Sequence, residues 1–125
     1  MKAAKPILVV EDDRSMRWLL QKQLEKLDYE SDAASNGQEA VLKLTKAPYR
    51  LIIMDISMPV MDGLEATRRI RAREQENNLP RTPIVAVTGA SEREDCMLAG
   101  VDDFYEIPLS IDDMRQILRR WLAER

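Results

Sequence analysis

Short runs of uninterrupted aliphatic residues alternate with longer amphipathic segments along the whole chain. Three runs contain no polar residue: Ile7–Val10, Leu51–Met54 and Ile84–Val87. Such runs are typical of strands that are buried on both faces of a parallel sheet. Two more polar segments, 29–34 and 103–107, complete a set of five predicted strands, and a helical pattern follows each. Five strand–helix units in succession predict an α/β fold with a parallel sheet and right-handed crossovers.

The polarity of the predicted strands indicates their order in the sheet. The three aliphatic runs should be central, and the two charged segments should form the edges. The order is then 2-1-3-4-5, a flavodoxin-like doubly wound five-stranded parallel sheet with five helices and a switch point between the first and third strands. The chain has 125 residues, of which 45% are hydrophobic, so residues 1–125 should form a single domain.

Capping residues and amphipathic patterns predict where the helices begin and which side chains they bury. Asn36, Asp62, Ser91 and Ser110 each stand three residues before an acidic residue, the spacing of a capping box. We expect packing roles for the two tryptophans, Trp18 and Trp121, and for Cys96. The third helix should turn most of its arginines to solvent: Arg68, Arg69, Arg71 and Arg73.

The composition excludes several classes of function. A net charge of -3 provides no basic field to attract nucleic acid. One cysteine and no histidine exclude an internal disulfide and a Cys/His zinc site, and they suit a cytoplasmic location. No apolar stretch reaches the roughly 18 residues that a membrane span requires, and Met1–Pro6 lacks the apolar region of a signal peptide.

Acidic side chains follow two of the aliphatic runs. Glu11, Asp12 and Asp13 come directly after the first run, Asp55 ends the third strand, and Thr88 follows the fourth. The carboxyl ends of parallel strands meet at one edge, so these side chains should converge at the switch point. Alternatively, the first three acids only cap the next helix, a role that suits Asp13. Capping does not explain why Asp55 and Thr88 should lie at the same edge.

Carboxylates gathered in a partly desolvated place require a cation. Because only oxygen ligands are present, the cation should be hard, Mg²⁺ or Mn²⁺. Mg²⁺ typically uses one or two carboxylates and leaves room for a phosphate group, to which the Thr88 hydroxyl could donate. A carboxylate beside a divalent metal ion can attack phosphorus and form an aspartyl phosphate.

Three segments resemble the receiver domain of bacterial two-component response regulators, in order and in spacing. They are Val9–Asp13, Met54–Gly63 and Val87–Ala90, and the resemblance extends over the whole chain. The resemblance implies that Asp55 accepts a phosphoryl group from a histidine kinase or a histidine phosphotransfer domain.

The resemblance also implies a set of metal ligands. Asp12 and Asp55 would bind Mg²⁺ directly, the Ser57 backbone carbonyl would be the third protein ligand, and Glu11 would act through a water molecule. Ser57 and Ala90 occupy positions that influence the lifetime of the phosphate in this family.

One residue departs from the family pattern within the implied switch. The family has a lysine immediately before the proline that follows the fifth strand, and here Ile107 precedes Pro108. Thr88 would move to grip the phosphoryl group, with Phe104 as the switch aromatic. Without the lysine charge, the pKa values of the clustered carboxylates should rise. Phosphorylation should still occur because Mg²⁺ supplies most of the positive charge. Its coupling to the movement of Thr88 and Phe104 should be weaker or rewired. We do not expect Arg14 to replace the lysine.

The sequence therefore predicts a phosphorylation-controlled binding module, and no enzyme activity beyond its own phosphoryl transfer and slow dephosphorylation. Its fourth helix, fifth strand and fifth helix would bind a downstream protein or a second copy. We expect the domain either to signal through such a contact, with no output domain after Arg125, or to belong to a larger regulator. The alternative is a degenerate receiver that binds partners without phosphorylation. A small hydrolase would need a second acid at Ser57, and a flavin or nucleotide binder would need a Gly-rich phosphate loop.

Overall fold

The computed structural model describes residues 5–56, 62–89 and 93–122. Strands and helices alternate strictly within these ranges. The strands are β1 (Ile7–Val10), β2 (Ser31–Ala34), β3 (Leu51–Asp55), β4 (Ile84–Thr88) and β5 (Asp103–Glu106). The helices are α1 (Arg14–Lys26), α2 (Gly37–Lys46), α3 (Gly63–Glu76), α4 (Arg93–Ala99) and α5 (Ile111–Trp121).

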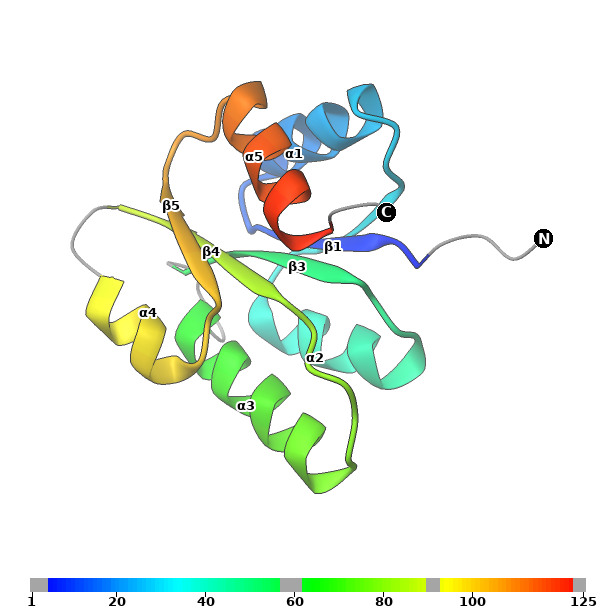
Figure 1. Ribbon diagram of the computed structural model, residues 1–125, viewed down its shortest axis with the longest axis vertical. Coiled ribbons are helices and arrows are strands. Elements are labelled where there is room, and N and C mark those ends of the chain that lie inside the picture. Colours follow the sequence, from blue (N-terminus) through cyan, green and yellow to red (C-terminus); the bar gives the residue numbers. More distant parts are fainter. Residues whose placement is uncertain (1–4, 57–61, 90–92, 123–125) are drawn as a thin grey trace.

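The strands form one parallel sheet in the order β2-β1-β3-β4-β5, which confirms the predicted fold and order. Helices α1 and α5 cover one face, and α2, α3 and α4 cover the other (Figure 1). In the register of the sheet, Val10 lies beside Met54, and Asp55 lies beside Val87. The chain therefore leaves β1, β3 and β4 at one edge of the sheet, where the polar residues after β1 and at the ends of β3 and β4 gather.

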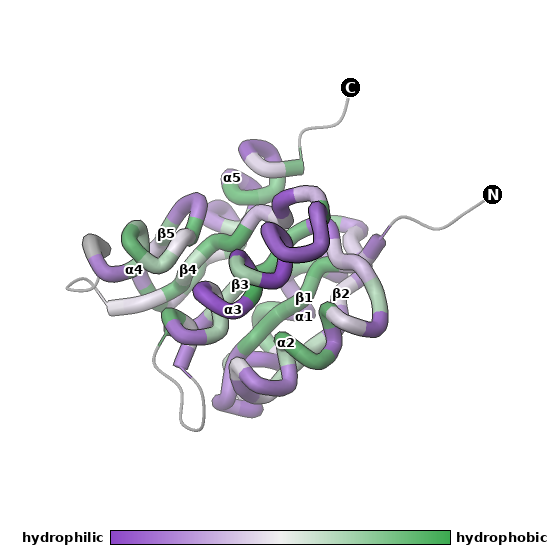
Figure 2. The backbone as a smooth tube through the Cα atoms, turned by 90° about the horizontal axis from the view of Figure 1, so that it is seen from below, coloured by the Kyte–Doolittle hydropathy of each residue, from purple (hydrophilic) through white to green (hydrophobic). Residues whose placement is uncertain are grey.

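Two apolar layers hold the sheet between its helices, because successive side chains of a strand point to opposite faces. Figure 2 shows the hydrophobic colour running through the strands at the centre of the molecule. The layer under α1 and α5 takes alternate residues of the central strands: Ile7, Val9, Leu51, Ile53, Val85 and Val87. The layer under α2, α3 and α4 takes the residues between them: Leu8, Val10, Ile52, Met54, Ile84 and Ala86.

Most of the predicted helix starts are present. The side chains of Asp13, Asn36 and Asp62 each accept a hydrogen bond from a backbone N–H in the first turn of the following helix. Ser110 and Asp113 form a complete capping box at α5. The expected cap at Ser91 lies outside the described residues.

Two expectations about side chains are wrong. Trp18 is 61% exposed, because α1 turns it away from the core. Arg71 does not lie on the solvated face of α3: its side chain is 12% exposed and forms ion pairs with Glu74 and Asp102. Asp102 is distant in the sequence, so helical periodicity could not predict this burial.

No helix in the described part of the chain is both long enough and apolar enough to cross a membrane.

Candidate functional site

Three carboxylates meet where β1 and β3 end. Glu11, Asp12 and Asp55 each place one carboxylate oxygen within 4.8 Å of the oxygens of the other two. Glu11 is buried, Asp55 is half-buried and Asp12 is exposed, so the group opens to solvent on one side. Convergence follows from the sheet order, because β1 and β3 are neighbours and run in the same direction.

Burial and neighbouring charges act on Glu11. Its pKa is raised to about 7, mainly by desolvation, with smaller contributions from the negative charges of Asp55 and Asp12 and a hydrogen bond with Asp55; a hydrogen bond from the Asp13 backbone opposes this rise. That N–H lies 3.0 Å from Glu11 Oε2. Negative charge in this cluster therefore exceeds what nearby donors compensate. Asp13 itself caps α1, with its carboxylate 3.2 Å from the Ser15 backbone nitrogen.

The donor set suits a hard divalent cation. Carboxylate oxygens are the ligands that Mg²⁺ prefers, and ligands on opposite sides of an octahedral Mg²⁺ are about 4 Å apart. The carboxylate oxygens of Glu11, Asp12 and Asp55, which lie within 4.8 Å of one another, would supply such ligands. The Ser57 carbonyl, predicted as a further ligand, and Ala90 lie outside the described residues.

Thr88 and Phe104 lie on the two strands beyond β3. Thr88 ends β4, one strand from Asp55, and is 2% exposed. Phe104 lies in β5 beside Ala86 and packs partly buried against the layer under α2, α3 and α4. Thr88 therefore lies at the same edge of the sheet as the acids, and Phe104 lies on the adjacent strand.

Ile107 follows β5 directly and reaches the same edge. Its backbone N–H donates to the Thr88 carbonyl at 3.1 Å, and 51% of its surface is exposed. A lysine at this position would extend from the end of β5, next to the end of β4 and on the side of the site away from β1. The apolar side chain leaves that side without the charge that the family pattern supplies.

The cation that reaches the acidic loop is Arg17, which the sequence reasoning did not identify. Its guanidinium Nη1 donates to the backbone carbonyl of Glu11 at 3.0 Å and to that of Asp12 at 3.5 Å. Arg14, which was considered, is exposed. The sequence position of Arg17 could have indicated this contact, because a side chain in the first turn of α1 can reach back to the loop that precedes the N-cap of that helix.

A comparison with protein families matches residues 7–119 to the response regulator receiver domain. This chain belongs to that family. Among similar proteins, hybrid signal transduction histidine kinase G of Dictyostelium discoideum is 42% identical over 120 residues, which are 92% of this receiver domain and 3% of that kinase. Kinase A of the same organism is 35% identical over 121 residues, 94% of this chain and 6% of that protein. The receiver domain thus spans a small fraction of these relatives.

Solved structures agree with this assignment. The receiver domain of sensor histidine kinase PA1611 from Pseudomonas aeruginosa PAO1, crystallised with magnesium in its active site cleft, is 34% identical. The match has a TM-score of 0.86 and covers 98% of this chain and all of that one. The receiver domain of Ssk1 from Saccharomyces cerevisiae, solved with the histidine phosphotransfer protein Ypd1, is 28% identical with a TM-score of 0.85. That match covers 95% of this chain and 91% of the other.

Proposed function

We propose that this receiver domain accepts a phosphoryl group on Asp55 in a Mg²⁺-dependent reaction and thereby switches a protein-binding surface. The observation that carries the proposal is the meeting of Glu11, Asp12 and Asp55 at the edge where β4 ends in Thr88. The magnesium ion in the cleft of the similar Pseudomonas receiver domain supports the choice of metal.

Each residue has a proposed role in the transfer. A carboxylate oxygen of Asp55 attacks phosphorus, and the bond between phosphorus and the donor breaks with its electron pair leaving on the donor. Asp12, Asp55 and the Ser57 carbonyl would hold Mg²⁺, and Glu11 would act through a water molecule. The bound ion would offset the negative charge of the phosphoryl oxygens. The Thr88 hydroxyl then donates to a phosphoryl oxygen, and Phe104 follows this movement as the switch aromatic.

We propose a histidine kinase or a histidine phosphotransfer domain as the phosphoryl donor, since a similar receiver domain was solved with such a protein. The output surface would be α4, β5 and α5, where a downstream protein or a second copy binds. Exposed apolar side chains support this choice, because Leu98 on α4 is 80% exposed and Met97 is 52% exposed. We propose no other enzyme activity, no nucleic-acid or membrane partner, and a cytoplasmic location.

The test is intact-mass analysis after incubation with acetyl phosphate and Mg²⁺. We expect a single phosphoryl adduct on the wild-type protein, none on Asp55→Asn, and none when EDTA removes the metal. Asp13→Asn is the matched control, because asparagine also caps helices and this residue is outside the acid cluster. An unmodified wild-type protein, or an adduct that persists in Asp55→Asn, would contradict the proposal.

Ile107 supports a second candidate function, a degenerate receiver that binds its partner without phosphorylation. If the wild-type protein forms no adduct but Ile107→Lys does, the degenerate reading is correct. If the wild-type protein is phosphorylated, we expect Ile107→Lys to accelerate the reaction or to enlarge the NMR shift changes of Thr88 and Phe104 on phosphorylation. Equal rates and equal shifts in both proteins would show that the missing lysine has no consequence.

A further inference from the structure

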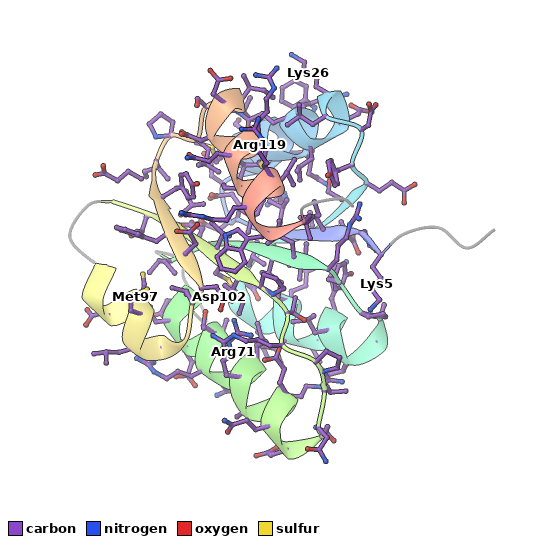
Figure 3. The ribbon with its side chains drawn as sticks, viewed as in Figure 1. Lys5, Lys26, Arg71, Met97, Asp102 and Arg119 are labelled. Atoms are coloured by element: carbon purple, nitrogen blue, oxygen red, sulfur yellow. The ribbon has the colours of Figure 1, made fainter. Side chains whose placement is uncertain are left out.

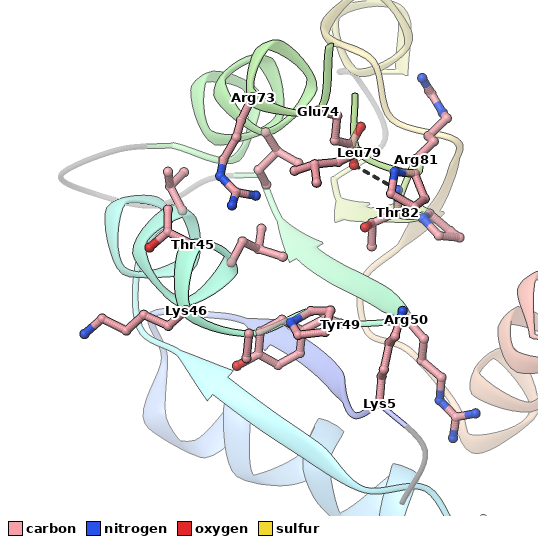
Figure 4. Close-up of a pocket in the computed structure, with 17 residues that line it drawn as sticks. Lys5, Thr45, Lys46, Tyr49, Arg50, Arg73, Glu74, Leu79, Arg81 and Thr82 are labelled. Atoms are coloured by element: carbon pink, nitrogen blue, oxygen red, sulfur yellow. Dashed lines mark hydrogen bonds between the residues drawn. The ribbon is translucent and has the colours of Figure 1, made fainter. Parts of the chain in front are cut away.

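A pocket of about 410 Å³ lies at the edge of the sheet opposite the acidic site. Its walls are the C-terminal halves of α2 and α3, the start of β3 and the segment 79–83 before β4 (Figure 4). Helices α2 and α3 pack side by side on the same face of the sheet. None of the three clustered acids lines this pocket, so it is a separate place on the molecule.

Apolar side chains form the middle of the pocket, and five cationic residues also line it: Lys5, Lys46, Arg50, Arg73 and Arg81. Val41 and Leu44 contribute from α2, Ile70 from α3 and Leu79 from the following segment. The ring of Tyr49 also lines the pocket, but its hydroxyl donates to Asp32 at 2.7 Å and is engaged elsewhere. Three prolines complete the lining and offer no N–H: Pro48, Pro80 and Pro83. A volume in this range and such walls suit the hydrocarbon part of a small molecule.

Arg73 supplies a cation to this apolar space. Figure 4 shows its guanidinium directed from α3 into the pocket. Arg73 is half-buried, and within residues 5–56, 62–89 and 93–122 it forms no salt bridge. The one acid that lines the pocket, Glu74, pairs with Arg71 at 2.8 Å and accepts from the Thr82 backbone at 2.9 Å. Arg81 at the rim pairs with Asp102.

A structural role explains part of this charge. Lys46 and Arg73 lie in the last turns of α2 and α3, where positive charge stabilises the negative helix ends. That role is sufficient for Lys46, which points away from the pocket in Figure 4. It does not explain why Arg73 faces an apolar cavity. The two helix ends also limit the ligand, because their partial negative charges oppose any anion and oppose a dianion more strongly than a single negative charge.

We propose that this pocket binds a small amphipathic monocarboxylate. The carboxylate accepts paired hydrogen bonds from the Arg73 guanidinium, a geometry that arginine provides and lysine does not. The aromatic or branched aliphatic body packs against Val41, Leu44, Ile70 and Leu79. Binding at this edge of the sheet does not require phosphorylation of Asp55, so either proposal can fail without the other.

The experiment is an NMR titration of the ¹⁵N-labelled chain with 3-phenylpropionate and with its uncharged amide, which has the same shape. We expect saturable shifts grouped at the pocket residues for the carboxylate, and affinity for the amide that is weaker by about tenfold or more. The dianionic 2-phenylethylphosphonate is the third ligand, and we expect it to bind more weakly than the carboxylate. No saturation at millimolar carboxylate, equal binding of the amide, or preference for the phosphonate would each overturn the proposal.

Arginine variants on one helix complete the test. Arg73→Gln should weaken carboxylate binding by about tenfold or more while leaving the amide unaffected. Arg68→Gln is the matched control, because Arg68 lies on α3, is 57% exposed and does not line the pocket. Unchanged carboxylate affinity in a well-folded Arg73→Gln protein would overturn the proposal, and so would an equal loss in Arg68→Gln.

Discussion

Two groups of carboxylates lie at opposite edges of the same sheet, and the protein neutralises them in different ways. Asp102 accepts from Arg71 at 2.6 Å, from Arg81 at 2.9 Å and from the Ile84 backbone at 2.9 Å. Figure 3 shows Arg71 and Asp102 between α3 and the start of β5. Glu74 shares Arg71 at 2.8 Å. Arginines of the chain itself therefore compensate these acids.

Positive side chains of the protein compensate the acids less at the other edge of the sheet, where Glu11 and Asp12 lie. In the described ranges no lysine or arginine forms a salt bridge with Glu11 or Asp12, and Arg17 donates to their backbone carbonyls. Burial, together with the negative charges of Asp55 and Asp12, raises the pKa of Glu11 to about 7. Arginine side chains thus pair with the carboxylates of Asp102 and Glu74, whereas no lysine or arginine of the described residues forms a salt bridge with the carboxylates of Glu11 and Asp12. This difference distinguishes a structural cluster of acids from one that suits an external cation.

The largest expected effect is at the structural cluster. Asp102→Ala removes the acceptor of two guanidinium groups and of the Ile84 N–H, and its own side chain is only 13% exposed. Leaving a buried Arg71 without this partner should lower the free energy of unfolding by about 3–5 kcal/mol. Chemical denaturation measures the loss. A change below about 1 kcal/mol would mean that the ion pairs at this edge are not structural.

A backbone change should disturb the candidate site more than a matched change nearby. A Cβ on Gly63 would overlap the Asp55 carbonyl and lie 2.8 Å from Ile56 Cα, whereas one on Gly89 meets no heavy atom of the described residues within 4 Å. Gly63→Ala should therefore destabilise the protein by about 1–3 kcal/mol and slow its phosphorylation. Gly89→Ala should change stability by less than about 0.5 kcal/mol. Equal denaturation midpoints for the two variants would contradict the close approach at Gly63.

Removing an acid from the candidate site should raise the free energy of unfolding instead of lowering it. Asp55→Asn relieves repulsion with Glu11 and Asp12, so the metal-free protein should gain about 1 kcal/mol of stability. Mg²⁺ should raise the melting temperature of the wild-type protein but not that of the variant. Thermal unfolding with and without EDTA tests both statements. Destabilisation of the metal-free variant would show that Asp55 is a structural acid like Asp102.

The smallest effect concerns an acid of intermediate exposure. The hydrogen bond from Tyr49 lowers the pKa of Asp32 below its ordinary value of 3.8, and Lys43 adds to this effect. The pKa of Tyr49 is raised to about 12. The contribution of Asp32 to stability is therefore fully present above pH 3.8 and is lost as the pH falls through its folded pKa. Tyr49→Phe should raise the Asp32 pKa toward 3.8 in a carboxyl NMR titration. Because the Asp32 side chain is 46% exposed, the accompanying change in stability should be small.

The sheet and the meeting of the acids could be predicted from the sequence because both depend on local patterns. Uninterrupted aliphatic runs identify buried strands, and charged segments identify the outer strands of the sheet. The predicted strand order therefore places Glu11 and Asp55 at the ends of two neighbouring strands. The burial of Arg71 could not be predicted, since its partner Asp102 is reached only through the packing of α3 against the β4–β5 region. The exposure of Trp18 and the pocket that Arg73 lines likewise depend on how the helices pack against one another. Periodicity within a single helix contains no such information.

Both outer strands of the sheet carry an aspartate that side chains of a neighbouring helix or connecting segment hold by hydrogen bonds. On β2, Asp32 accepts from Tyr49 and Lys43, and on β5, Asp103 accepts from Arg120 and Trp121 of α5. Short strands with charged residues are poor templates for strand addition. Assemblies of this protein should therefore not grow by extending the sheet into a neighbouring chain. A binding partner therefore has to recognise side chains and not the free backbone of an outer strand.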